Sequence, residues 1–271
     1  DGGRTWDVGA MSIRTPGSLV IWADEHVNYD LTAQQAIEQG MENVPTTCQG
    51  GINFAHPDFA LMCARTGLGA GTLSWFYVSY DRCNSWDGPF SLPTFGLPGI
   101  EARTDYLVSG PDECTMFLTA AKAGGDEGAG VFCLRIGNGG KAFEFVSWVA
   151  RTDRDFFLMP SSIRLSESRI ITAVRCQEQG EFTESRHWIA LYGSGNNGIT
   201  WHYMGRPVLD TGIGGNPPAM LRLSDGRLCV VYGFRRPPYG IRAVLSTDEG
   251  KSWSDEFVLR ADGGNHDIGY P

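Results

Sequence analysis

The segment Ser246-Thr247-Asp248-Glu249-Gly250-Lys251-Ser252-Trp253 follows the pattern Ser-x-Asp-x-Gly-x-Ser/Thr-Trp, and variants of it recur along the chain. The copy at 1–6 lacks the first two residues, the copy at 194–201 has Asn in place of Asp, and the copy at 79–86 lacks the Gly. A degenerate fifth copy occupies 138–143. A phrase that recurs in this way indicates a repeat architecture.

Each copy has the composition of a tight hairpin turn. The Asp or Asn side chain can accept hydrogen bonds from backbone N–H groups that follow it, and Gly supplies a residue with positive φ. The closing Trp carries a large ring that is expected to be buried between neighbouring sheets. We therefore expect the phrase to be structural, including its Asp residues.

The spacing of the copies predicts a β-propeller. Asp81, Asn138, Asn196 and Asp248 are separated by 57, 58 and 52 residues, slightly more than the about 40–50 residues of a four-stranded blade. The 80 residues from Asp1 to Asp81 are too long for one blade and would fit two short ones.

The sequence around the phrase repeats as well. Residues 162–170 align with 220–228, and 12–19 form a weaker third copy; each copy has the pattern strand, tight turn, strand. Short apolar runs bounded by Gly, Pro and Asp turns predict an all-β fold. Only residues 31–41 are helix-like. Four arginines recur at repeat positions and are expected to pack blades together: Arg164, Arg169, Arg222 and Arg227.

Composition narrows the class of protein. The 271 residues carry a net charge of −9, which argues against nucleic acid and anionic membranes as partners. No apolar run approaches the about 18 residues of a membrane span, and no signal peptide is visible. Seven scattered cysteines without a Cys-x-x-Cys pair predict buried thiols rather than a metal site. We expect one propeller domain over 1–271.

The chain starts inside a copy of the phrase, and residues 266–271 have the pattern of another inner strand. We therefore expect an incomplete part of a six-bladed ring, with a natural N-terminus further upstream. Open sheet edges would favour self-association, so the sequence leaves the oligomeric state open.

In a propeller, the repeated turns and the ligand-binding site are expected on opposite faces. The turns between third and fourth strands share one face, so we expect a site around the central channel on the opposite face. Strand starts there offer His56, Asp58, Glu101, Arg103, Asp105, Asn216, His266, Asp267 and Tyr270. Loops there offer Asp24, Glu25, His26, Lys122, Arg175, Glu178, Arg235, Arg236, Tyr239 and Arg242.

The repeated phrase is similar to the Asp-box (BNR) repeat of sialidases. The whole chain resembles bacterial sialidase-like BNR proteins, with segments 51–60, 102–106, 238–242 and 267–271 most alike. The resemblance implies a sialidase-type propeller that acts on a glycan with side chains alone, without a metal or an organic cofactor. Asp boxes also occur in sortilin-like receptors, xyloglucanases and assembly factors.

The resemblance also implies a mechanism suited to a negatively charged sugar. Sialidases hold a sugar carboxylate with three arginines, attack with a Tyr assisted by a Glu, and use an Asp as general acid–base. The candidate arginines are Arg103, Arg175 and Arg242, with Arg235 as a substitute. The candidate nucleophiles are Tyr270 and Tyr239, the bases Glu178 and Glu101, and the acids Asp58 and Asp267. His56, Glu101 and Asp105 are further candidate substrate contacts.

Other interpretations of these residues stay open. The Phe-Arg-Ile-Pro motif that carries the first family arginine does not occur in the sequence. Arg103 and Asp105 can form a plain ion pair, Arg235 and Arg236 can lie in a solvated loop, Tyr239 can serve packing, and His56 and His266 can be turn residues. The alternative functions are a non-catalytic propeller that binds glycan or protein, a neutral glycosidase, and a lyase.

Overall fold

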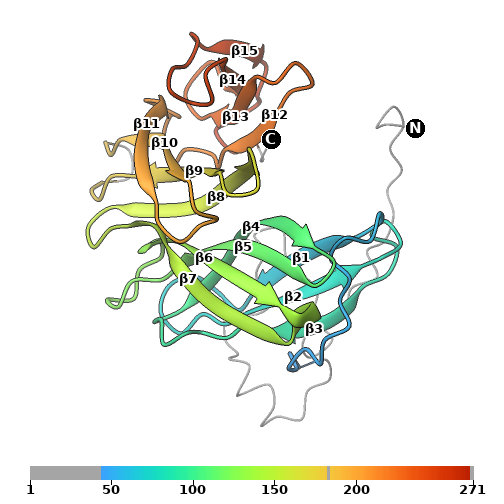
Figure 1. Ribbon diagram of the computed structural model, residues 1–271. Coiled ribbons are helices and arrows are strands. Elements are labelled where there is room, and N and C mark those ends of the chain that lie inside the picture. Colours follow the sequence, from blue (N-terminus) through green and yellow to red (C-terminus); the bar gives the residue numbers. More distant parts are fainter. Residues whose placement is uncertain (1–43, 182–183, 269–271) are drawn as a thin grey trace.

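The computed structural model describes residues 44–181 and 184–268, which form four antiparallel sheets arranged around an arc (Figure 1). The first copy of the phrase, the weaker repeat at 12–19, the helix-like stretch 31–41, and Asp24, Glu25, His26 and Tyr270 lie outside the described residues.

The sheets follow one another along the chain. Blade 1 contains β1 (Ala60–Arg65), β2 (Ser74–Ser79) and β3 (Asp87–Ser91). Blade 2 contains β4 (Ile100–Gly110), β5 (Glu113–Ala120), β6 (Gly130–Gly137) and β7 (Ala142–Arg151). Blade 3 contains β8 (Phe156–Arg164), β9 (Ile170–Gln177), β10 (His187–Ser194) and β11 (His202–Val208). Blade 4 contains β12 (Ala219–Arg222), β13 (Leu228–Phe234), β14 (Gly240–Ser246) and β15 (Phe257–Arg260).

Within each blade the strands pair antiparallel in sequence order, so that every strand neighbours the next one along the chain. The first strands of adjacent blades contact one another: β1 with β4, β4 with β8, and β8 with β12. Strands joined by hairpins and stacked around one axis are the architecture of a propeller. The predicted all-β propeller is confirmed, with four blades in the described residues; these residues do not support the expected number of six.

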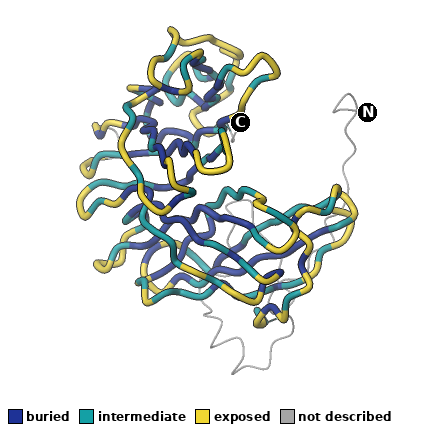
Figure 2. Tube along the Cα trace, viewed as in Figure 1, coloured by how far each residue is buried: buried dark blue, intermediate teal, exposed yellow. Residues whose placement is uncertain are grey.

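The core lies between the blades, because alternate residues of a strand face opposite neighbours. In β5, Met116 and Leu118 join the cluster shared with blade 1, whereas Phe117 joins the cluster shared with blade 3. Blades 3 and 4 meet through a third cluster that includes Leu191 and Val230. Figure 2 shows that burial concentrates in the middle strands of each sheet, while many of the connecting turns are exposed.

The repeated phrase forms the same hydrogen-bonded turn at 79–86, 194–201 and 246–253, which we call the repeated turns. In the last of them, Asp248 accepts hydrogen bonds from Ser246 Oγ (2.8 Å), Ser252 N (2.8 Å) and Ser252 Oγ (2.5 Å). Asp81 accepts the equivalent three bonds at 2.9, 2.9 and 2.6 Å. Asn196 replaces the carboxylate by accepting from Thr200 N and donating to Thr200 Oγ1, both at 2.9 Å.

The closing tryptophans are partly buried as expected. Trp201 packs edge-on against Phe117 with ring centroids 6.0 Å apart, and Trp253 packs against the cluster between blades 3 and 4. These two indoles also donate to a carbonyl of their own turns, at 3.1 Å for Trp201 and 3.2 Å for Trp253, whereas the Trp86 indole makes no such bond. The turns are therefore structural, as predicted.

Two of the recurring arginines connect blades. Arg164 donates to Asn197 of the repeated turn in its own blade (2.7 Å) and to Ser109 of blade 2 (3.2 Å). Arg169 of blade 3 pairs with Glu249 of blade 4 at 2.8 Å. Their predicted role in blade packing is confirmed.

Hydrogen bonds from Ser252 and Ser246 lower the pKa of Asp248 to about 2. Because the folded-state pKa lies below the unfolded value of about 3.9, this carboxylate stabilises the fold above pH 4 and loses that contribution as the pH falls towards 2. We expect Asp248→Asn, which copies the natural Asn196 turn, to flatten the fall of Tm between pH 4 and pH 2. Thermal melts of both proteins test this; equal slopes would contradict it.

Candidate functional site

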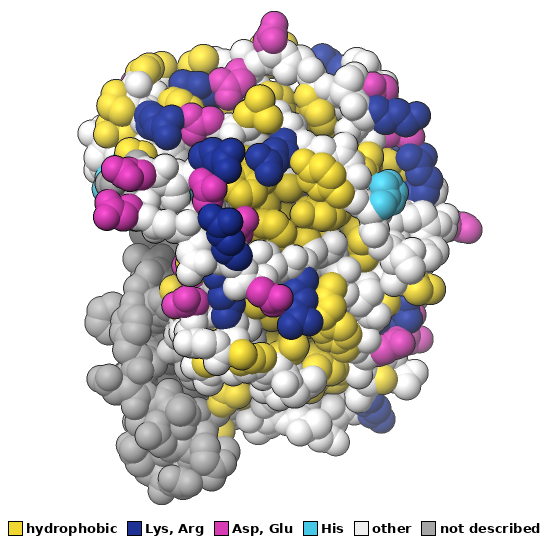
Figure 3. Space-filling view, turned by 90° about the vertical axis from the view of Figure 1, so that its left-hand side faces the viewer, with side chains coloured by type: hydrophobic (Ala, Val, Ile, Leu, Met, Phe, Trp, Pro, Cys, Tyr) yellow, Lys and Arg dark blue, Asp and Glu magenta, His cyan; other side chains and the backbone are white. Residues whose placement is uncertain are grey.

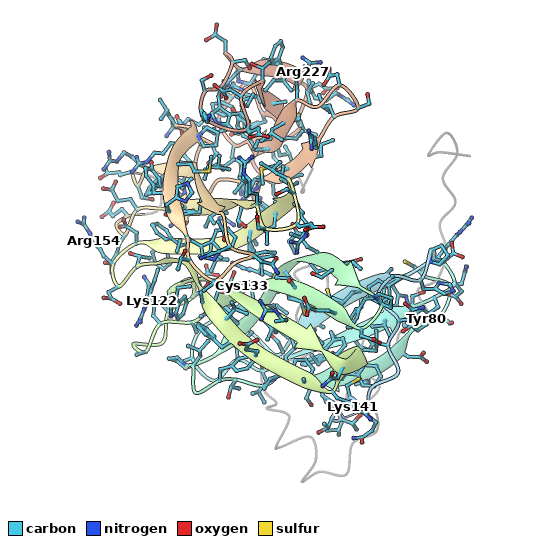
Figure 4. The ribbon with its side chains drawn as sticks, in the orientation of Figure 1. Tyr80, Lys122, Cys133, Lys141, Arg154 and Arg227 are labelled. Atoms are coloured by element: carbon cyan, nitrogen blue, oxygen red, sulfur yellow. The ribbon has the colours of Figure 1, made fainter. Side chains whose placement is uncertain are left out.

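The propeller has two distinct faces. The repeated turns define the turn face; the β5–β6, β9–β10 and β13–β14 loops and the blade-to-blade connections define the loop face. In Figure 4 the loop face, marked by Lys122 and Arg154, lies on the left, and the turn face, marked by Tyr80 and Lys141, lies towards the right. Figure 3 views the left-hand side of the molecule, where Lys and Arg side chains gather with Asp and Glu around hydrophobic side chains.

A cavity of about 420 Å³, which we call the channel cavity, lies where the inner strands meet. This volume is within the range of small-molecule sites, about 300–1,000 Å³. Four segments line it, one from each blade: residues 61–63, 102–106, 159–161 and 217–219. Because these segments are on the first strand of each blade or directly precede it, the fold itself assembles the site.

Arg103 is the charged group best placed to bind a ligand in the channel cavity. Its side chain is 11% exposed and its Nη1 lies 2.6 Å from Glu127 Oε2 of the β5–β6 loop. Its buried Nε has no hydrogen-bond partner among the described residues. A guanidinium that lines a cavity is suited to binding a carboxylate, because its planar fork of N–H donors matches the two oxygens.

Glu101 lies fully buried beside this pair. Its Oε1 accepts hydrogen bonds from Gly69 N (3.2 Å) and Gly128 N (3.3 Å), which belong to the β1–β2 and β5–β6 loops. Burial raises its pKa to about 7, nearby Glu127 adds to the rise, and the charge of Arg103 opposes it. Since Glu101 is enclosed, it positions the two loops rather than contacting a ligand.

A raised carboxyl pKa has a measurable consequence for stability. Between about pH 4.5 and 7 the folded protein holds a proton on Glu101 that the unfolded chain has released, so stability falls as the pH rises through this window. We expect Glu101→Gln, which keeps the Oε1 acceptor, to remove this part of the fall in Tm between pH 5 and 8. An unchanged pH profile in the variant would show that Glu101 is ionised throughout.

Two further predicted arginines lie on the loop face. Arg175 donates through Nη1 to Met159 Sδ (3.1 Å) and through Nη2 to the Gly214 carbonyl. Met159 lines the channel cavity, whereas Arg175 lies behind it and is not among the lining residues. Arg235 is largely buried and pairs with Asp267 at 3.1 Å, so it is not part of a solvated loop.

The expected position of His56 and Asp58 on the loop face is wrong. Asp58 pairs with Arg82 at 2.7 Å, and the His56 ring packs edge-on against Tyr80 at 5.3 Å; both partners belong to the repeated turn 79–86. The segment before β1 is not an inner strand. It crosses the turn face, because Ile52 N binds the carbonyl of Gly139 (3.0 Å) and Phe54 N binds that of Pro111 (2.9 Å).

Arg242 does not line the channel cavity. Its Nη1 pairs with Glu256 at 2.7 Å, and its guanidinium stacks 3.3 Å from the centroid of the Phe234 ring, within blade 4. The other carboxylate oxygen of Glu256 accepts a hydrogen bond from the Tyr232 hydroxyl. Tyr232 is fully buried, and burial raises its pKa, so this tyrosine–glutamate pair links strands and is not a nucleophile.

Asp105 connects blades instead of pairing with Arg103. Its carboxylate accepts from Ser162 N (2.5 Å) of β8 and Tyr106 N (2.8 Å), and burial raises its pKa. The simple ion pair of Arg103 with Asp105 is therefore wrong, since Glu127 is the partner of Arg103.

Among the described residues, the predicted base Glu178 and the predicted nucleophile Tyr239 do not line the channel cavity. Arg186 binds Glu178 through two hydrogen bonds (3.0 and 2.9 Å) and lowers its pKa to about 2, which makes Glu178 a poor base. Tyr239 is half-buried, with its carbonyl bound by Gly263 N (3.0 Å). His266 is exposed.

Sequence reasoning missed two residues of the site. Glu127 follows a glycine-rich loop and pairs with Arg103, and no motif marks it. Tyr106 lines the channel cavity, accepts a hydrogen bond from Leu61 N at 3.4 Å, and has a pKa that burial raises. Tyr106 lies in the segment 102–106 that carries the family resemblance, which is the signal that points to it.

Neither metal clusters nor membrane spans are found in the described part of the chain. Across 44–181 and 184–268, no three His, Cys, Asp or Glu side chains group together as metal ligands would. The same residues contain no helix long and apolar enough to cross a membrane.

No protein-family model and no curated protein matches the chain, but many solved structures share its fold. A protein of unknown function from Dyadobacter fermentans superposes with a TM-score of 0.60 and 20% identity, over 83% of this chain and 66% of that one. A Hadza microbial sialidase gives 0.57 and 12% over 75% and 45%, and a Penicillium chrysogenum α-L-arabinanase gives 0.53 and 13% over 79% and 67%.

The chain thus spans about two thirds of the Dyadobacter protein and under half of the sialidase. At these identities the comparisons establish that the chain has the propeller fold that these proteins share. The chemistry has to be inferred from the chain's own residues.

Proposed function

We propose that this propeller is a glycoside hydrolase that binds an acidic sugar in the channel cavity, with terminal sialic acid as the first substrate to test. The observation that carries the proposal is Arg103, a largely buried arginine that lines a cavity formed by the first strands of four blades. The fold supports it, because a sialidase and an arabinanase share this propeller.

In this proposal Arg103 binds the sugar carboxylate, while Arg175, in contact with the lining residue Met159, adds positive charge nearby. Glu127 holds the Arg103 side chain in place before a ligand enters. Asp267, held by Arg235 at 3.1 Å, is the candidate general acid, and Tyr270, three residues later, is the candidate nucleophile. Side chains alone supply these groups, so the reaction needs no metal or organic cofactor.

A second candidate function is a propeller that binds glycans without cleaving them. Tyr106 is the tyrosine that lines the channel cavity among the described residues, and burial raises its pKa. A phenol with a raised pKa is a weak nucleophile at neutral pH. The same arginines would still hold an acidic sugar.

Fluorogenic glycosides separate the two. The protein is incubated with an α-sialoside and, in parallel, an α-L-arabinofuranoside. Release from the sialoside alone supports the proposal, release from the arabinoside alone replaces it with a neutral glycosidase, and binding of 3′-sialyllactose without release favours the second function. If the protein neither releases the fluorophore nor binds 3′-sialyllactose, the proposed site for acidic sugars is contradicted.

The domain boundaries belong to the same proposal. We propose that residues 1–271 belong to one propeller domain and that the complete ring has six blades.

A further inference from the structure

A second cavity, of about 360 Å³, shares no lining residue with the channel cavity. It lies between the β5–β6 loop and the connection from β7 to β8. The side chains that matter in it are Lys122, Asp126, Trp148, Arg151, Asp153 and Gln179.

The charges around this second cavity balance. Lys122 and Arg151 line the cavity together with Asp126 and Asp153. The lining therefore has no net charge that would attract an anion or a cation. Both cations are also engaged: Lys122 Nζ donates to the Arg154 carbonyl (2.9 Å) and lies 3.8 Å from the Phe156 ring centroid. The Arg151 guanidinium lies 5.2 Å from the Trp148 ring. The cavity therefore suits an uncharged ligand with many hydroxyl groups.

Trp148 gives the second cavity a fixed aromatic wall. Its ring packs edge-on against Phe132 (5.9 Å) and Phe145 (5.5 Å), so the core holds its orientation. An aromatic surface beside a few placed polar groups is the usual composition of small-ligand sites. Sugars match it well, because their C–H faces pack on rings and their hydroxyls bind carboxylates and amides.

We propose that the second cavity is a binding site for a neutral sugar unit, separate from the site for the acidic sugar. One loop connects them: the β5–β6 loop presents Glu127 to Arg103 and Lys122 and Asp126 to the second cavity. The choice of a sugar as ligand rests on the proposed function.

The test uses ligand-observed saturation-transfer NMR with lactose and maltotriose, neutral sugars that lack the carboxylate for the channel cavity. We expect transfer to at least one of them and at least a tenfold weaker Kd in the double variant Asp126→Ala/Gln179→Ala, whose two side chains are exposed. Trp148→Phe, which retains a ring, should weaken binding less. Arg103→Ala should bind these sugars as the parent does.

The opposite results overturn the inference: no transfer to either sugar, or binding that Arg103→Ala abolishes and the double variant leaves unchanged. Sialoside hydrolysis is measured on the same proteins to separate the two proposals. If the protein hydrolyses the sialoside but does not bind neutral sugars, only the proposal of a second site is wrong. If it binds neutral sugars through Asp126 and Gln179 but does not hydrolyse the sialoside, only the proposed function is wrong.

Discussion

Arg103→Ala is expected to lower kcat/KM on the α-sialoside by about 30- to 5,000-fold. Removing one partner of a buried, hydrogen-bonded charge interaction costs about 2–5 kcal/mol, and each 1.4 kcal/mol or so is a factor of ten. The variant loses the guanidinium that lines the channel cavity and leaves Glu127, a partly exposed carboxylate, without its partner. Steady-state kinetics measure the loss.

Two matched variants sharpen this result. Arg103→Lys retains the charge but not the planar fork, so its kcat/KM should lie between those of the parent and the alanine variant. Arg227→Ala removes an exposed arginine whose partner is Asp225 on the turn face, and it should behave as the parent does. Equal activity of Arg103→Ala and the parent would remove Arg103 from the site.

Phe132→Ala is expected to destabilise the fold by about 3–5 kcal/mol, the usual cost of truncating a buried aromatic residue. Phe132 is fully buried between blades 1 and 2, and it stacks on Phe145 with centroids 5.1 Å apart and planes 16° apart. The cavity left behind would cost contacts on both sides of the interface. Urea denaturation of parent and variant gives the difference in free energy of unfolding.

Phe257→Ala is the control for this effect, because the Phe257 side chain on the outer strand β15 is 49% exposed. It should change stability by no more than about 0.5 kcal/mol. Phe132→Leu, which keeps most of the volume, should cost under about 1.5 kcal/mol. Similar losses for Phe132→Ala and Phe257→Ala would mean that the interface between blades 1 and 2 contributes little.

The fold was predictable from the sequence because its signals are local. The turn at 246–253 closes on itself through Asp248 and two serines, so the residues that determine it are neighbours in the chain. The degenerate copy shows how far this extends: 138–140 form a short 3₁₀ helix between β6 and β7, with Asn138 at φ 52° and Gly139 at φ 59°. Turn geometry persists there without Asp or Trp.

The site was only partly predictable because its partners are distant in sequence. Arg103 and Glu127 are 24 residues apart, and so are Tyr232 and Glu256. His56 and Asp58 were misplaced because the segment before β1 has the alternation of a strand, yet backbone bonds to blade 2 hold it across the turn face. Arg242 was placed in a loop, whereas it is the third residue of β14.

The buried carboxylate of Glu101 sets a rule for redesigning specificity. It fastens Gly69 and Gly128 by their backbone N–H groups, and a Cβ at Gly69 would lie 2.0 Å from the Gly125 carbonyl oxygen. These anchor points cannot be exchanged independently of one another. Gly125 belongs to the same set, because its φ is 108° and its carbonyl accepts a hydrogen bond from Ala70 N at 3.2 Å. The exposed residues 123 and 124 make no such demand on their side chains, so substitutions there should alter ligand preference while the underlying scaffold keeps its shape.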